Sequence, residues 1–221
     1  MTNPIQFDLC IGRKKPYSKN HDACPFCTPE KLTNILEKQG EMIWLMNKYP
    51  VFSDTWPTVL IETDRHKSEL SEYSPGQLHE VVSFGLEKWH QMEKDRRLNL
   101  SSTSVTLVPI QADPSVIPTP RSSACTIMIT QIISGMKIFG GPVFHEDRSC
   151  IATLSDYPIC GMAEFNVMLK PDGTTDAFAD TMQTIVKFVL HDFPIPCDSY
   201  NLFFYRLKNI YVKIFPRYIA S

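Results

Sequence analysis

The order of the predicted elements restricts the fold of this chain more than any other feature of the sequence. Two amphipathic stretches of helical period, at 74–94 and 176–192, each follow a group of strand-like runs rich in β-branched residues. The second stretch has four apolar residues on one helical face: Phe178, Met182, Ile185 and Val189. The order strands, helix, strands, helix, strands predicts an α+β fold in which helices pack on an antiparallel sheet.

Local start and stop signals set the expected boundaries of these elements. Ser74 is an N-cap followed by proline at the first helical position, and Pro194 stops the second helix. Similar reasoning predicts a short helix from Pro29 to Gln39, with Gly40 just beyond its end. Strands are predicted at 41–46, 58–62, 149–154, 164–169, 200–207 and 210–215.

The length of 221 residues suits one large domain or two small ones. The predicted elements have the same rough layout in residues 1–139 and in residues 140–221, so we expect two similar halves without a close sequence repeat. Because the chain stops soon after its last predicted strand, we expect the second half to be truncated.

Charge and hydropathy exclude several classes of function. The formal net charge of −2 gives no support for binding to nucleic acid or to a membrane surface through bulk charge. No run approaches 18 apolar residues, so we expect no membrane span. The first residues lack the layout of a signal peptide. We therefore expect a cytoplasmic protein, whose seven cysteines are thiols or metal ligands rather than a disulfide framework.

A charge-poor window interrupts the chain. Leu98–Met136 contains 39 residues and only two charged ones, Asp113 and Arg121, although the whole chain has 22 basic and 24 acidic residues. Its apolar residues follow neither a helical nor an alternating period. A long stretch of this kind inside a compact domain indicates an abnormal segment rather than an ordinary linker.

The sharpest local motif is Cys24-Pro25-Phe26-Cys27. This spacing lets two thiolates bind one tetrahedral zinc ion, although a complete site needs further ligands. A redox-active pair of the thioredoxin kind is the rival interpretation, but that motif belongs after a strand of a βαβ unit. Two partly buried thiols without a metal are the third.

Six histidines are candidates for the missing ligands: His21, His66, His79, His90, His145 and His191. His79 and His90 occupy helical positions that favour surface roles, and His191 ends a helix, where a cation complements the dipole. His145 opens an acidic turn that is typical of solvated surface. His66 follows a predicted strand directly and is the best placed, although by itself it is typical of an exposed loop histidine.

Asn47-Lys48-Tyr49 follows the first predicted strand at once. An amide and an ammonium held by a Tyr-Pro turn suit the polar edge and the phosphate of a nucleotide. A simple exit from a strand into a turn explains the same residues without any ligand.

Together these motifs resemble galactose-1-phosphate uridylyltransferases, which belong to the histidine-triad superfamily. The likeness rests on the Cys-x-x-Cys motif, the string NKYP and the run ETDRHKSELSE at 62–72, and in the second half on Tyr200-Asn201 and Ile214–Arg217. A little-characterised bacterial branch of the family has the same CPFC and NKYP strings. The resemblance covers residues 10–95 and 140–221.

The resemblance implies a histidine-triad-like antiparallel sheet and assigns the candidate sites. Cys24, Cys27 and His66 match zinc ligands, and nucleotide binding falls to Asn47, Lys48 and Tyr49. The second half departs from the family, because Tyr211-Val212-Lys213 stands where many relatives have a His-x-His strand. We therefore expect no second metal there.

The catalytic element of the family, His-Pro-His-Ser-Gln, is missing. Its first histidine completes the zinc site and its second is the nucleophile, but this chain has Ile117 and Thr119 at these positions and Arg121 at the glutamine. Reading each codon one base earlier, so that the third base of one codon joins the first two of the next, permits His, Pro, His, Ser and Gln over Ile117–Arg121. We hypothesise that residues of about 98–139 are translated out of frame, and a genuine divergent insertion is the alternative.

The expected function follows from this resemblance. The family exchanges UDP-sugars and hexose 1-phosphates through a uridylyl-histidine. We predict a nucleotidyltransferase-type protein that binds a nucleotide sugar, forms no nucleic-acid or membrane complex, is compatible with a homodimer, and is inactive in this chain. The alternative is a non-catalytic, zinc-stabilised nucleotide-binding or interaction module. Loss of a central strand with the catalytic loop also predicts an unpaired sheet edge and low stability.

Overall fold

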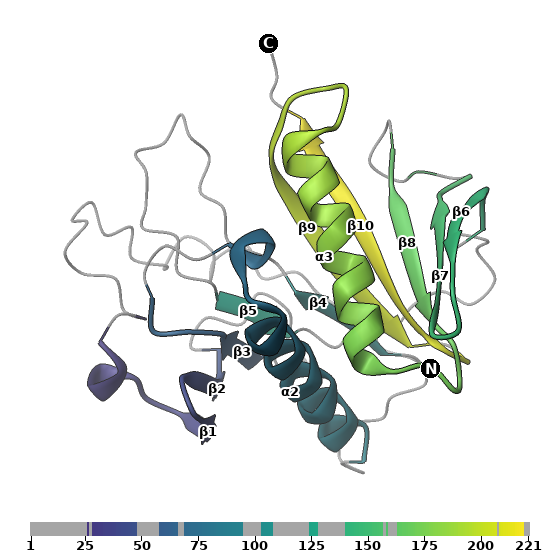
Figure 1. Cartoon of the computed structure of the whole chain (residues 1–221). Helices are drawn as coiled ribbons and strands as arrows, with labels where there is room; N and C mark the ends of the chain where they lie inside the picture. Colours follow the sequence, from purple (N-terminus) through teal and green to yellow (C-terminus); the bar gives the residue numbers. More distant parts are fainter. Residues whose placement is uncertain are drawn as a thin grey trace, which may run out of the picture. The chain divides into compact units, whose positions relative to one another are not determined.

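The computed structural model describes most of the chain outside its N-terminus and the charge-poor window (Figure 1). The described residues are 26, 28–47, 58–65, 69–94, 103–107, 124–127, 140–156, 158, 163–206 and 208–218. The chain forms two compact units, one of Met1–Ser68 with Ile110–Ile129 and one of Glu69–Pro109 with Thr130–Ser221. The segment 69–109 thus belongs to the same unit as the C-terminal part, and the predicted division at 139/140 stays a prediction.

The first unit is built on a four-stranded antiparallel sheet of order β1-β2-β3-β5. Its strands are β1 (Ile35–Gln39), β2 (Met42–Met46), β3 (Thr58–Ile61) and β5 (Ala124–Ile127). Alternate residues of β2 and β3 form one apolar face, namely Ile43, Leu45, Val59 and Ile61. Phe26, Leu32 and Ile35 pack against it, so this small core holds the sheet to the segment before β1.

The predicted helix from Pro29 to Gln39 is wrong. The structure has one 3-10 turn, η2 (Pro29–Lys31), followed by β1. Gly40 is the first residue of a two-residue hairpin loop, with φ +58°, instead of the end of a helix. Glycine at this position is typical of a tight hairpin, and Ile35 gains a packing partner in β2 that a surface helix lacks. Tertiary pairing therefore overrides the local helix signals.

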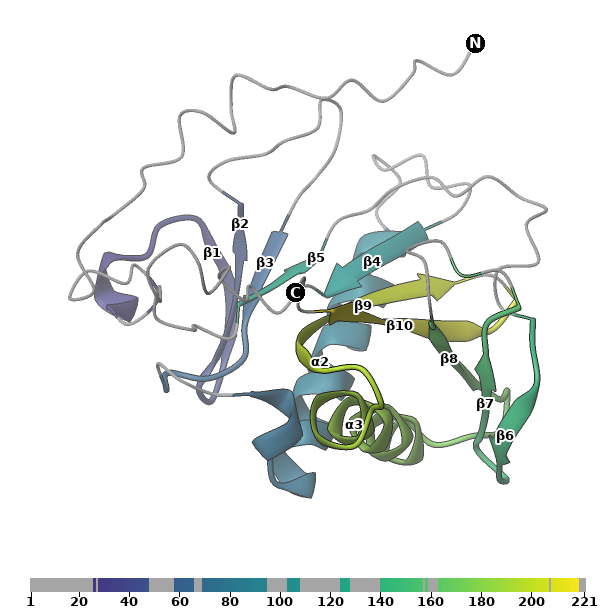
Figure 2. The ribbon, with the colours of Figure 1, turned by 90° about the horizontal axis from the view of Figure 1, so that it is seen from above.

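The second unit contains a six-stranded antiparallel sheet of order β4-β9-β10-β8-β7-β6 (Figure 2). Its strands are β4 (Thr103–Leu107), β6 (Val143–Glu146), β7 (Cys150–Leu154), β8 (Phe165–Leu169), β9 (Cys197–Arg206) and β10 (Ile210–Tyr218). The predicted strands at 149–154, 164–169, 200–207 and 210–215 are confirmed, and the last two form a longer hairpin than expected.

Two helices accompany this sheet, and both were expected from the sequence. Helix α2 (Pro75–Glu93) begins at Ser74, whose hydroxyl accepts from the Gln77 N–H, and it follows the 3-10 turn η3 (Leu70–Glu72). Helix α3 (Thr175–His191) begins at Thr174, which caps it in the same way. In Figure 1, α3 runs along β9 and β10, and its apolar face is buried as predicted.

The face of the sheet toward α3 is apolar. Ala152, Val167, Val212 and Phe204 form a continuous row across four strands and are buried. Phe178 of α3 lies edge-on to Phe204, with ring centroids 6.2 Å apart. Burial of such a row is the main force that fixes α3 on the sheet. The α+β fold with antiparallel sheets packed by helices is thereby confirmed.

The charge-poor window contributes two strands that its sequence did not reveal. β4 pairs with β9 and β5 pairs with β3, so the outer side of β3 is not left as the unpaired edge that the sequence predicted. The partner strands of β4 and β5 are distant in the sequence, so no local periodicity predicts these pairings. No helix in the described part of the chain is long and apolar enough to cross a membrane.

Candidate functional site

Most residues assigned to the sites by sequence lie outside the described residues. These are Cys24, Cys27, Lys48, Tyr49, His66, Thr119 and Arg121. Their assignments as zinc ligands, nucleotide contacts and replaced catalytic residues stay predictions. The structure does describe Asn47 and the segments next to the cysteine motif and to His66.

Phe26 connects the cysteine motif to the first unit. It packs against the apolar cluster of β2 and β3, which includes Ile61, the last residue of β3. Phe26 lies between Pro25 and Cys27 in the sequence and is the residue of the motif that the structure describes. His66 follows β3 by five residues. Within the described residues, Phe26 packs on this small sheet and residues 62–65 continue from its strand β3.

The exit from β3 is held by a short polar network. The Thr63 hydroxyl donates to Glu41 Oε2 at 2.9 Å, and Thr63 is only 4% exposed. The backbone N–H and the Nε of Arg65 donate in turn to Thr63 Oγ1, at 3.3 and 3.4 Å. This network orders the chain up to the residue before His66.

Asn47 lies at the other end of β3. It follows Met46, which pairs with Thr58, the first residue of β3, whereas the exit toward His66 follows Ile61. Three residue steps of a strand span about 10 Å. Asn47 and the exit from β3 toward Arg65 therefore lie at opposite ends of this pair of strands.

A buried ion pair in the second unit escaped the sequence analysis. Lys213 is 0% exposed and Glu164 is 1% exposed, and the Lys213 Nζ donates to Glu164 Oε2 and to Ser155 Oγ, both at 2.9 Å. Two opposite charges in such a place require each other, because either one alone is costly to desolvate. In this ion pair, unlike that of the buried Lys88 with the exposed Glu87, both partners are buried.

The ion pair lies on the sheet face that does not contact α3. Lys213 is opposite Asn166, which is opposite Thr153, and side chains directly across strands share a face. Asn166 Nδ2 donates to Thr153 Oγ1 at 3.2 Å. A polar row of strands β7, β8 and β10 thus backs the apolar row that packs on α3.

The sequence held a weak signal for this cluster. Lys213 is the one charged residue of the run Ile210–Phe215, which otherwise suits a buried strand, and we interpreted it only as a departure from the family pattern. Its partners Ser155 and Glu164 are 58 and 49 residues away. A charged residue inside an apolar strand calls for a buried counterion, but spacing alone cannot identify which one.

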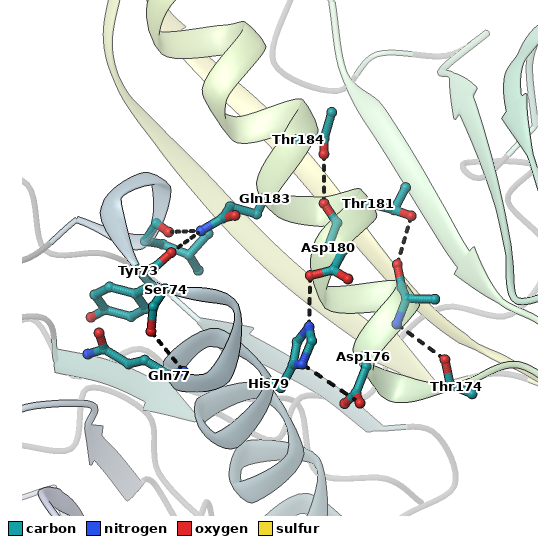
Figure 3. A network of polar contacts seen from close by, with 12 residues as sticks. Tyr73, Ser74, Gln77, His79, Thr174, Asp176, Asp180, Thr181, Gln183 and Thr184 are labelled. Carbon is teal, nitrogen blue, oxygen red and sulfur yellow. Dashed lines mark hydrogen bonds and ion pairs between the residues drawn. The ribbon is translucent and has the colours of Figure 1, made fainter.

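Helices α2 and α3 are joined by a second polar network (Figure 3). His79 Nε2 is 2.7 Å from Asp180 Oδ1, and its Nδ1 is 3.7 Å from Asp176 Oδ2. The His79 side chain is 26% exposed, so the predicted surface position is only partly right. Because both ring nitrogens face carboxylates, this histidine is placed to clamp two helices rather than to act as a free base.

Gln183 and Tyr200 extend the contacts of the second unit to η3. Gln183 Nε2 donates to the carbonyls of Leu70 and Tyr73, at 2.8 and 2.9 Å (Figure 3). The Tyr200 hydroxyl donates to the Glu69 carboxylate, which also caps η3 through the Leu70 N–H. These bonds explain why the segment before α2 is fixed on α3 and β9.

His145 was expected in an acidic turn, but it lies in strand β6. The turn itself begins at Asp147, whose carboxylate accepts from the N–H groups of Cys150 and Ser149. The Cys150 N–H is the main cause that lowers the pKa of Asp147, and His145 at 3.5 Å adds to it. Among the described residues, no group of three His, Cys, Asp or Glu side chains is arranged to hold a metal ion.

Comparison with known families matches most of the chain to one family in two stretches. Residues 7–106 match "Domain of unknown function (DUF4931) N-terminal domain", and residues 134–221 match "Domain of unknown function (DUF4931) C-terminal domain". Residues 107–133, within the charge-poor window, lie between the two matches. No protein with a curated functional description matches the sequence.

Three solved structures place this backbone among known folds. A DUF4931 family protein from Bacillus cereus ATCC 10987 is 29% identical, with a TM-score of 0.72 over 85% of this chain and 87% of that one. An ADP-glucose phosphorylase from Arabidopsis thaliana with bound ADP-glucose is 13% identical, with a TM-score of 0.67 over 95% and 85%. A uridylyltransferase is 15% identical, with a TM-score of 0.63 over 92% and 82%. The last two establish a shared fold only.

Proposed function

We propose, from the premise that this chain belongs to the DUF4931 family, that it is a nucleotidyltransferase-type protein that binds a nucleotide sugar and is inactive in its present sequence. One observation carries the proposal: an ADP-glucose phosphorylase solved with ADP-glucose and a uridylyltransferase share the fold of this chain, over 95% and 92% of its length. The motifs of the sequence resemble the same class. Proteins that share a fold can catalyse different reactions, so the proposed chemistry depends on which residues occupy the site.

The reaction of the resembling family needs a nucleophilic imidazole. A histidine nitrogen bonds to the α-phosphorus of a UDP-sugar, the hexose 1-phosphate leaves, and a second sugar phosphate then takes the uridylyl group. This chain has Thr119 at the position of the nucleophile and Arg121 at that of the stabilising glutamine. An unactivated threonine hydroxyl is a poor nucleophile at neutral pH. We therefore propose that binding through Asn47, Lys48 and Tyr49 persists while transfer does not occur.

Zinc fits the donor set that the chain retains. Two thiolates and one imidazole, from Cys24, Cys27 and His66, are ligands that Zn²⁺ prefers, and a fourth position can be taken by water. Two observations next to these residues support the proposal: Phe26 packs on the apolar cluster of the first sheet, and Thr63, three residues before His66, is hydrogen-bonded to Glu41. When bound, zinc supplies a cross-link between these segments, and three protein ligands predict weaker binding than four.

The reading-frame hypothesis is the genetic part of the proposal. This hypothesis is tested on the nucleotide sequence of the gene. Codons 95–141 should read through in the shifted frame and spell His-Pro-His-Ser-Gln over positions 117–121. A stop codon within that stretch in the shifted frame eliminates the hypothesis and leaves a divergent insertion.

The second candidate is a non-catalytic, zinc-stabilised nucleotide-binding or interaction module. Ile117 and Thr119 favour it, because a family that has no use for transfer can lose both histidines and keep the scaffold. Cytoplasmic location and a homodimer are compatible with both candidates and belong to the proposal.

Labelling with UDP-glucose that has ³²P at the α-phosphate separates the two candidates. We expect no adduct on this chain and a base-stable, acid-labile phosphohistidine-type adduct on a chain with the shifted frame restored. Substituting the second histidine of the restored motif with asparagine is the matched control and should abolish the label. Nucleotide binding without any adduct on the restored chain favours the module over the enzyme lineage.

A further inference from the structure

We draw no further inference here: the strongest candidate, the exposed apolar patch that Phe144 of β6, Leu154 of β7 and Phe188 of α3 form around Phe165 of β8, carries none, because nothing in the described part of the chain shows what covers it.

Discussion

The two units hold their strands together with different kinds of polar contact. In the first unit, Glu41 just before β2 and Thr63 just after β3 are hydrogen-bonded at the ends of these two neighbouring strands, 22 residues apart in the sequence. In the second, Lys213 and Glu164 form an ion pair in the interior, with both side chains almost fully buried. The first contact can be lost at moderate cost, whereas loss of one member of the second leaves a charge without solvent. The burial of a polar contact, more than its bond length, therefore determines how much its loss destabilises the fold.

The ion pair should give the largest effect of any single substitution considered. Lys213→Met leaves the Glu164 carboxylate buried without its cation and should lower the free energy of unfolding by about 3–5 kcal/mol. The double variant Lys213→Met, Glu164→Leu should recover most of that loss, because it removes both charges. Urea unfolding of the three proteins is the measurement.

The matched control is the exposed ion pair of Lys170 with Glu146, whose nitrogen and oxygen atoms are also 2.9 Å apart. Lys170→Met should cost less than about 1 kcal/mol. If Lys170→Met and Lys213→Met cost the same, burial is not what makes the second unit depend on its ion pair.

Alkaline pH should weaken the second unit through a buried thiol. Desolvation raises the pKa of Cys150 to about 11, and the carboxylate of Asp147 adds to the shift. The unfolded thiol ionises near 9.0, so stability is intact below that pH and falls as the pH rises from 9 toward 11. The loss is roughly 2 kcal/mol in free energy of unfolding.

Unfolding measured at pH 8, 9, 10 and 11 tests this sign. Cys150→Ala should reduce the alkaline slope, and the slope that remains should have the same sign because burial also raises the pKa of Cys197. An unchanged slope in Cys150→Ala rules out this thiol as the cause.

Substitution of Gly40 in the β1–β2 hairpin should destabilise the first unit. Gly40 has φ +58° and nothing within 4 Å of an added Cβ, so Gly40→Ala introduces backbone strain without a steric clash. The expected loss is about 1 kcal/mol. Gly76→Ala, in the first turn of α2 and equally uncrowded, is the control and should be neutral or slightly stabilising. Equal effects at both positions contradict the left-handed turn.

The smallest effect is expected for the clamp between α2 and α3. A double-mutant cycle of His79→Ala and Asp180→Asn should give a coupling free energy of about 0.5 kcal/mol, because the pair is partly exposed. His90→Ala in the same helix has no contact with Asp180 to lose and serves as the comparison. A coupling free energy near zero assigns helix docking to the apolar contacts alone.

Local signals predicted α2 and α3 well because the Ser74 cap, the stop at Pro194 and the apolar faces are all local, whereas the Thr174 cap was seen only in the structure. They failed at Pro29–Gln39, where proline at the start and glycine at the end suit both a helix and a 3-10 turn followed by a hairpin. Only the pairing of β1 with β2 decides between the two.

The candidate site was predictable to a smaller extent. Motif likeness could name Cys24, Cys27 and His66, but not the hydrogen bond of Thr63 with Glu41, which depends on the pairing of β2 with β3. Lys213 was visible as an anomaly, but its partners Ser155 and Glu164 lie in the connection between β7 and β8, 58 and 49 residues away. The sequence patterns did not predict these interactions, because the residues involved are distant in the sequence.

Isothermal titration of this chain with UDP-glucose tests the central claim most directly. We expect saturable binding of one ligand per chain, with affinity weakened at least about tenfold in Asn47→Ala, a loss of about 1.4 kcal/mol. The exposed Glu30→Ala variant should bind as the parent does. Absence of saturable binding to UDP-glucose and to ADP-glucose, with the chain folded by circular dichroism, contradicts a nucleotide-sugar-binding protein.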